Sequence, residues 1–236
     1  MKKIIATVLV LSSLVYAGNM GEGKGNSGAK KQMKMFQSVP MDKATIVQDG
    51  KAKMYCPSCG MTLPMFYRTN HSADVNGHTK QYCSIHCLSE DKIKNGANVK
   101  NIKVVDNKTL KFIDVKSATY VVGSSKKGTM TMKSKYAFSN KADAQKFADK
   151  FGGDVMNFEG ANKIALKGLD KEIAMISKKQ AMMAEKGKMM YNKMCKKTDL
   201  KFASTADAKA FVKSSKICGE MKGKKLQAVG IYLGRR

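Results

Sequence analysis

Two closely spaced pairs of cysteines constrain this chain more than any other feature of its sequence. Cys56 and Cys59 form a C-x2-C pair, Cys83 and Cys87 form a C-x3-C pair, and residues 60–82 separate them. Two turn-borne pairs of this kind can converge on a single ion as thiolates, as in a closed tetrahedral zinc site. The fold is therefore expected to bring two distant turns together, around a metal or through disulfides.

The N-terminus predicts export from the cytoplasm. The chain opens MKK, continues through the apolar run IIATVLVLSSLVYA, and reaches a small-x-small cleavage site that ends at Ala17. We therefore expect residues 1–17 to be a signal peptide and the mature protein to be periplasmic. The apolar run is shorter than the roughly 20 residues that span a bilayer. In an oxidising compartment disulfides compete with metal ions for the same thiols.

The charge of the chain is strongly positive, with 44 Lys and Arg against 18 Asp and Glu and a formal net charge of +26. Such an excess often indicates a nucleic-acid partner. The export signal, the scattered lysines and the lack of a base-stacking aromatic motif argue against one here. The charge better suits an acidic protein partner or weak contact with an anionic membrane surface. It does not indicate an oligomeric state.

The first half of the chain predicts a flexible arm followed by short strands. Residues 18–40 are rich in Gly, Ser and Lys and should form the arm. The elements expected next are a β-hairpin over 44–55 around Asp49-Gly50, an extended stretch over 61–69, a polar loop with exposed His71 and His78, and a turn entering a helix over 81–95.

The second half has clearer signals. The β-branched and aromatic runs 109–115 and 118–124 predict an antiparallel pair of strands. Ser139 is the expected N-cap of a helix that Gly152 ends, and a strand should follow from residue 154. This order is ββαβ, which the first half repeats more weakly. From about Gly168 the pattern is helical, with Ser204 or Thr205 as a later N-cap. The predicted fold class is α+β, with a helical C-terminal module.

Soft sulfur ligands favour copper at the cysteine pairs. Cys59-Gly60-Met61 places a thiolate and a thioether two residues apart, and thioethers bind Cu(I) well and Zn(II) poorly. His86, between Cys83 and Cys87, is a candidate ligand or outer-shell group. The chain has 18 methionines, which otherwise fill gaps in cores. Further candidate ligands are Met54, Met65, Met130 and Met132, and the arm with its neighbouring segment adds Met33, Met35 and Met41.

The two remaining cysteines, Cys195 and Cys218, most simply form a disulfide. In the chain-entropy model its loop length corresponds to a stabilisation of roughly 3 kcal/mol. The sequence contains no recognisable catalytic triad, phosphate-binding loop or paired carboxylates in the context of a pocket. We therefore expect a protein that is not an enzyme.

Three segments carry a family resemblance. CPSCGM, YVVGSSKKGTM and AFSNKADAQKFADKFGGDVMNF, in this order, resemble the NosL family of nitrous-oxide reductase accessory proteins over residues 41–163, leaving 164–236 outside. The resemblance implies a fold of two ββαβ units. It also implies a periplasmic metallochaperone that binds Cu(I) and passes it to apo-nitrous-oxide reductase in denitrification, together with a membrane maturation transporter.

The family's Cys-Gly-Met motif falls on Cys59, Gly60 and Met61, and its distal methionine on Met130 or, less well, Met132. The extra pair Cys83 and Cys87 departs from many members, and so does the lack of an anchoring cysteine after the leader. The extra pair leaves a second ion, a zinc site or a disulfide open.

The working hypothesis is a Cu(I) site formed by Cys59, Met61 and Met130, with Cys56 as a fourth candidate ligand. One alternative is a zinc-stabilised, treble-clef-like interaction module of the periplasm. Another is a thiol redox protein that uses Cys56 and Cys59.

Overall fold

The structure, a computed structural model, describes residues 35–96 and 98–236. The expected signal peptide, residues 1–17, and most of the expected arm lie outside the described residues. Among the helices of the described part, none is long and apolar enough to cross a membrane.

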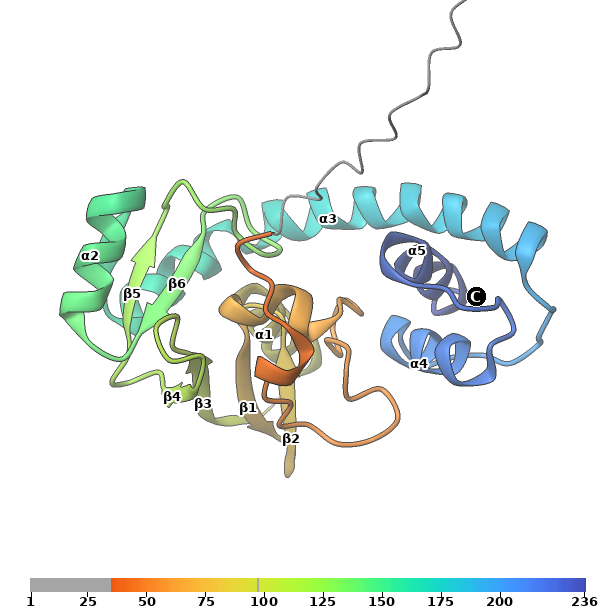
Figure 1. Ribbon diagram of the computed structural model, residues 1–236, viewed down its shortest axis with the longest axis horizontal. Coiled ribbons are helices and arrows are strands. Elements are labelled where there is room, and N and C mark those ends of the chain that lie inside the picture. Colours follow the sequence, from red (N-terminus) through yellow and green to blue (C-terminus); the bar gives the residue numbers. More distant parts are fainter. Residues whose placement is uncertain (1–34, 97) are drawn as a thin grey trace, which may run out of the picture. The chain divides into compact units, whose positions relative to one another are not determined.

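The first sheet has four antiparallel strands in the order β2-β1-β3-β4 (Figure 1). Its strands are β1 (His71–Val75), β2 (His78–Tyr82), β3 (Val99–Val105) and β4 (Phe112–Asp114), and the helix α1 (Ile85–Asn95) follows β2. Asn76 and Gly77, both with positive φ, form the tight turn between β1 and β2. The expected polar loop is therefore wrong. His71 is buried in β1, whereas His78 is exposed as expected.

The second sheet has three antiparallel strands in the order β6-β5-β7. Its strands are β5 (Thr119–Val122), β6 (Lys135–Phe138) and β7 (Asp154–Met156), and α2 (Lys141–Phe151) connects β6 to β7. Phe147 of α2 packs on Tyr136 and Phe138 of the sheet. The N-cap is Asn140, whose side chain accepts a hydrogen bond from the backbone of Asp143, and not Ser139.

The expected antiparallel pair of 109–115 with 118–124 is also wrong. Both runs contain strands, but β4 pairs with β3 in the first sheet and β5 pairs with β6 and β7 in the second. The link Lys116-Ser117 lacks the Gly or Asn that a two-residue hairpin turn favours, which explains the separation. The strand β6 was not predicted.

The segment before the first sheet also differs from expectation. No hairpin forms within residues 44–55, because side chains from other segments accept hydrogen bonds from backbone amides of this segment. The Thr45 amide donates to the Tyr67 hydroxyl, and the Val47 amide donates to Gln81 Oε1. The stretch expected to be extended is a 3-10 helix, η2 (Leu63–Thr69), with a proline in its first turn.

Order begins before Met41. The ring of Phe36 packs on Tyr136, Phe147 and Phe151. Gln37 is buried and donates to the Lys127 carbonyl. The last residues of the expected arm are therefore part of the folded core.

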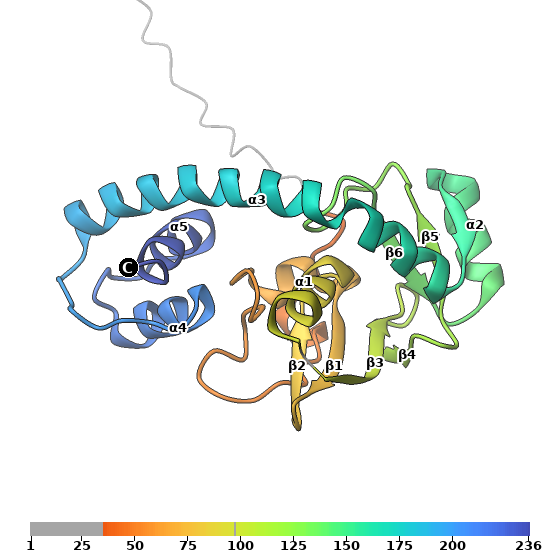
Figure 2. The same cartoon turned by 180° about the vertical axis from the view of Figure 1, so that it is seen from behind.

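The C-terminal part is helical, as predicted, but its first helix begins earlier than Gly168. Helix α3 (Phe158–Met194) is capped by Asn157, which accepts from the Gly160 amide. Helix α4 (Thr205–Ser215) has the predicted N-cap Ser204, and α5 (Gly223–Leu233) follows. Figure 2 shows α5 beside α3, whose Gly187 lies directly against the Ala228 carbonyl.

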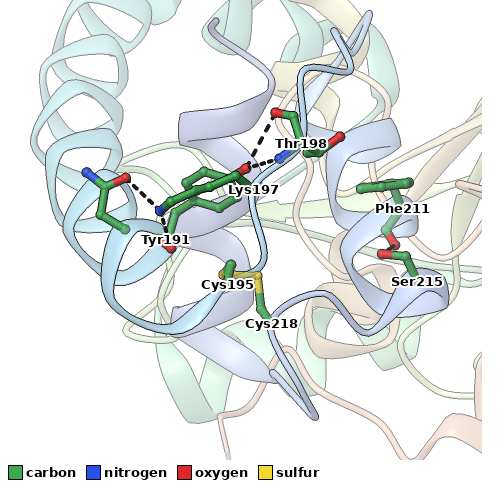
Figure 3. The surroundings of a disulfide bond; sticks show 8 residues. Tyr191, Cys195, Lys197, Thr198, Phe211, Ser215 and Cys218 are labelled. Atoms are coloured by element: carbon green, nitrogen blue, oxygen red, sulfur yellow. Dashed lines mark hydrogen bonds between the residues drawn. A yellow bond between two sulfur atoms is a disulfide. The ribbon is translucent and has the colours of Figure 1, made fainter.

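The predicted disulfide between Cys195 and Cys218 is present (Figure 3). It joins the C-cap of α3 to the segment between α4 and α5. Cys218 belongs to the apolar core of the three C-terminal helices, and Cys195 packs against that core. The α+β class with C-terminal helices is confirmed.

Candidate metal centre

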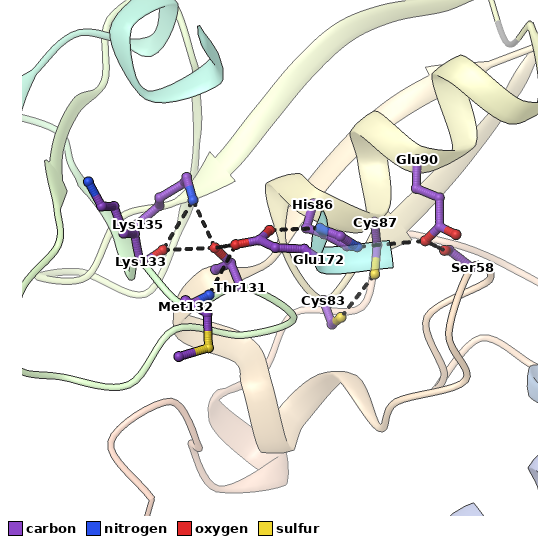
Figure 4. Close-up of polar contacts among 10 residues, drawn as sticks. All are labelled: Ser58, Cys83, His86, Cys87, Glu90, Thr131, Met132, Lys133, Lys135 and Glu172. Atoms are coloured by element: carbon purple, nitrogen blue, oxygen red, sulfur yellow. Dashed lines mark hydrogen bonds and ion pairs between the residues drawn. The ribbon is translucent and has the colours of Figure 1, made fainter. Parts of the chain in front are cut away.

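Four cysteines from two distant turns converge in the first half of the chain. We call Cys56, Cys59, Cys83 and Cys87 the thiol cluster: all are buried, and their sulfur atoms lie within 4.8 Å of one another. The Cys83 sulfur is 3.5 Å from that of Cys59 and 3.6 Å from that of Cys87 (Figure 4 draws the second contact). All four are free thiols, so the structure does not pair them as disulfides.

Local hydrogen bonds shape the turn that carries the first pair. The Cys56 amide donates to the Met61 carbonyl, and the Gly60 amide donates back to the Cys56 carbonyl. Gly60 has φ of +71°, and a Cβ there would lie 2.3 Å from Thr205 Cγ2 of α4. Glycine is therefore required both for the left-handed backbone and for the close approach of the helix.

Helix α1 presents the second pair. Cys83 lies just before its N-cap, Ser84, and Cys87 lies in its first turn. Residues four apart at a helix start face the same side. Because β2 leads directly into this helix, the hairpin of β1 and β2 fixes where the two thiols point.

The cluster fits a soft metal ion. Four sulfurs placed tetrahedrally at about 2.3 Å from an ion are separated by about 3.8 Å, close to the 3.5 and 3.6 Å found here. Thiolates suit both Zn(II) and Cu(I). The donor set and its spacing could therefore hold a metal ion.

Proton affinities within the cluster are unequal. Burial alone would raise the pKa of the Cys56 thiol, but hydrogen bonds from Cys59, Cys83 and Cys87 hold that pKa well below its usual value. Burial, together with hydrogen bonds to Cys56 and Cys59, raises the pKa of Cys83 well above it. The cysteines therefore do not hold their protons equally, and a bound ion would displace the protons that remain.

A buried lysine from α4 lies beside the cluster. Lys209 is 1% exposed, donates to the Gly60 carbonyl and to Gln227 Oε1, and lies 4.2 Å from the ring centroid of Tyr55. Burial lowers its pKa to about 8, and the electrostatic influence of Cys59, Cys56 and Cys83 opposes this shift.

Gln227 of α5 in turn donates to the Cys59 carbonyl. Lys209 and Gln227 thus link two C-terminal helices to the Cys-Gly-Met turn. Lys209 also supplies positive charge where a metal-thiolate group would be negative. Sequence reasoning missed both residues, because 149 positions separate Lys209 from Gly60 and no local motif marks the pair.

The predicted thioethers lie on one side of the cluster. Met61 and Met130 are partly buried and pack against the same apolar core as the four cysteines. Together with Cys59 they line a cavity of about 450 Å³, which we call the methionine-lined cavity. Cys59 is the one cysteine among its described lining residues. Met130 also has a positive φ of 58°, which is uncommon for a non-glycine residue.

Three other predicted methionines, Met35, Met65 and Met132, line the same cavity. Met132 is largely exposed, at 77%, and Met65 is 38% exposed. Met54 lies elsewhere, because it packs against the core of the C-terminal helices. Met41 is exposed, and Met33 lies outside the described residues.

His86 is not brought into the thiol cluster. Its Nδ1 lies 3.1 Å from Glu172 Oε2 of α3, and its Nε2 lies 3.8 Å from Glu90 Oε2 (Figure 4). Glu172 also accepts from the Thr131 hydroxyl and the Met132 amide. Burial would raise the pKa of Glu172, but these hydrogen bonds and the one to His86 lower it. The ring therefore serves to connect α1, α3 and the loop that carries Met130 and Met132.

Comparison with known proteins relates the chain to a protein family and to a solved structure. The NosL family model matches residues 47–165, about half of the chain. The crystal structure of the copper chaperone NosL from Shewanella denitrificans is similar at 24% identity, over 52% of this chain and 94% of that chain, with a TM-score of 0.37. No curated protein matches the chain.

Proposed function

The chain belongs to the NosL family, and from that premise we propose that it is an exported, non-enzymatic Cu(I) carrier that delivers copper to nitrous-oxide reductase. The observation that carries the proposal is the convergence of four free thiols, one of which, Cys59, opens onto a methionine-lined cavity. Family membership also supports the expectation that the protein is not an enzyme.

Cys59 is the central ligand in this proposal. Met61 and Met130 share the cavity with it and supply thioethers, and Cys56 lies on the same turn. Cys83 and Cys87 complete the thiol cluster from the other side. A carrier must release its ion by ligand exchange. Cys59 lies at the wall of the cavity, where a ligand of the acceptor could replace one of the ligands of the bound ion. The cavity therefore provides the route of exchange.

The setting of the site suits delivery. The strands of each sheet and the helix between them follow in the order ββαβ, and the first sheet has β4 in addition. This order is consistent with the pair of ββαβ units that the family resemblance implies. The acceptor proposed is apo-nitrous-oxide reductase, reached together with a membrane maturation transporter in the periplasm. The net charge of +26 favours an acidic surface on that acceptor or an anionic membrane beside it.

Replacing Cys59 tests this function directly. Titration of the reduced Cys59→Ser protein with Cu(I), against a chromogenic Cu(I) chelator, should show the loss of tight stoichiometric binding, since the ligand shared by cluster and cavity is gone. Circular dichroism should show an intact fold. Ser58→Ala is the matched control, because Ser58 lies on the same turn but is exposed. Unchanged copper affinity in the Cys59→Ser protein would contradict the proposal.

The thiol cluster also favours a second candidate, a zinc-stabilised interaction module. The four cysteines are 3% exposed or less, and the sulfur separations of 3.5 and 3.6 Å are close to those of a closed tetrahedral zinc site. Elemental analysis after anaerobic purification separates the candidates. Chelation does so too, because removing a structural zinc unfolds its domain, whereas removing carried copper should not. A thiol redox role is less favoured, because redox cysteines need an accessible thiolate and Cys56 is buried.

A further inference from the structure

The methionine-lined cavity collects far more thioethers than chance would place there. Seven of the 19 described residues that line it are methionines, against 18 of 236 in the chain. Six of the seven come in pairs from three separate segments of the chain: Met61 and Met65, Met130 and Met132, Met175 and Met183. The last pair lies on α3, beyond the 47–165 region that matches the family.

The pair on α3 faces the cavity by helical periodicity. Met175, Lys179 and Met183 are spaced four residues apart, which places them on one side of the helix, and all three line the cavity. Met182 and Met189 of the same helix are 54% and 65% exposed and are not among the described lining residues. The helix therefore has methionines both toward the cavity and away from it.

Core packing accounts for only part of this arrangement, because Met61 and Met130 pack against the core around the cysteines and the other methionines of the cavity do not. Methionines that fill a core leave little space between them, whereas these surround a cavity of about 450 Å³. Met132 and Met65 are also substantially exposed. Because thioethers are neutral and soft, a group of them in one cavity is chemically selective for a monovalent soft ion.

We propose that this cavity binds a second Cu(I) ion on thioethers, with Met175 and Met183 of α3 among the ligands. The inference rests on the proposed function, since the ion would be on its way to or from Cys59 at the wall of the cavity. Lys179 and Lys224 also line the cavity, and their positive charge disfavours firm retention of a cation. The second ion should therefore be held more weakly than the first and should exchange with it.

The test compares two double variants of α3. In Met175→Leu/Met183→Leu the thioethers facing the cavity are removed with little change in volume. In Met182→Leu/Met189→Leu, the matched control, exposed thioethers of the same helix are removed. Each reduced protein is titrated with Cu(I) against chelators of graded affinity. The wild type and the control should bind two ions, one tightly and one weakly, and the cavity variant should lose only the weak one.

Two outcomes overturn the inference. One is a wild type that binds a single Cu(I), and the other is a cavity variant that keeps the weak ion. Repeating the titration with Zn(II) adds a check, because a weak site that takes Zn(II) equally well is not a thioether site. If tight, Cys59-dependent binding of Cu(I) is not observed, that result counts against the proposed function instead. The two failures are therefore distinguishable.

Discussion

At the scale of single residues, the buried charge of Lys209 is the least expected part of the candidate site. A buried ammonium group is costly unless it has partners. Here its partners are three oxygens, of Gly60, Thr62 and Gln227, an aromatic ring and the electrostatic field of the thiol cluster. Helix α4, far along the chain, lies beside the Cys-Gly-Met turn and positions this charge there.

Removing this charge should weaken metal binding. We expect Lys209→Met to lower metal affinity by about tenfold or more, as is typical for groups just outside a ligand shell, because a metal-thiolate cluster would lose its compensating cation. Competition titration measures the effect. Lys213→Met is the control, since Lys213 lies on the same helix but pairs with Glu220 at the surface. Equal affinities for the two variants would refute this role of Lys209.

Gly60 offers a second test of the contact between the turn and α4. Gly50 and Gly60 both have a positive φ, but a Cβ at Gly50 would meet nothing within 4 Å, whereas at Gly60 it would overlap Thr205. Gly50→Ala should cost about 1 kcal/mol of backbone strain, and Gly60→Ala clearly more. Denaturant unfolding measures both. Similar losses of stability would show that α4 does not pack on the turn.

At the scale of elements, capping signals predicted helices better than hydrophobic runs predicted strand partners. Ser204, one of the two expected N-caps, caps α4, and the N-cap of α2 differs from the expected residue by one position, because a cap depends on residues within one turn. The pairing of β4 and β5 was mispredicted, since the partners of each strand come from elsewhere in the chain. The β1-β2 hairpin could have been found, because Asn76-Gly77 is a strong turn signal.

The two sheets are connected by a buried histidine. His71 of β1 has Nδ1 3.1 Å from the Thr69 carbonyl and Nε2 3.0 Å from the Tyr120 hydroxyl of β5. A carbonyl only accepts, so Nδ1 carries the proton and Nε2 accepts from the tyrosine. Burial lowers the pKa of His71 from 6.5 to about 4, so the folded protein keeps the ring neutral.

This shift predicts a loss of stability in mild acid. Between pH 6.5 and about 4 the unfolded chain binds a proton at His71 that the folded protein does not. The free energy of unfolding should therefore fall by roughly 3 kcal/mol through that window on account of this residue. Denaturant titrations across pH measure the fall. His71→Gln should remove this fall in the free energy of unfolding. The control His78→Gln, on the exposed part of β2, should keep it. If the free energy of unfolding of His71→Gln depends on pH as in the wild type, His71 is not its cause.

At the scale of the whole molecule, the C-terminal helices are part of the candidate site. Tyr55, next to the first cysteine, belongs to their apolar core, and the disulfide between Cys195 and Cys218 closes that core. Cysteine spacing predicted that the two pairs converge but left open whether they bind metal or form disulfides, whereas the disulfide was predicted because Cys195 and Cys218 are the two remaining cysteines in an oxidising compartment. It could not predict Lys209, Gln227 or the methionines of α3, because their approach depends on tertiary packing.

The proposed carriage of Cu(I) on sulfur can be tested by X-ray absorption at the copper edge, on reduced protein loaded with one equivalent of Cu(I). We expect a monovalent ion whose first shell is sulfur alone, supplied by thiolates of the cluster and thioethers of the cavity. A first shell of nitrogen or oxygen would contradict it, as would copper that does not remain bound.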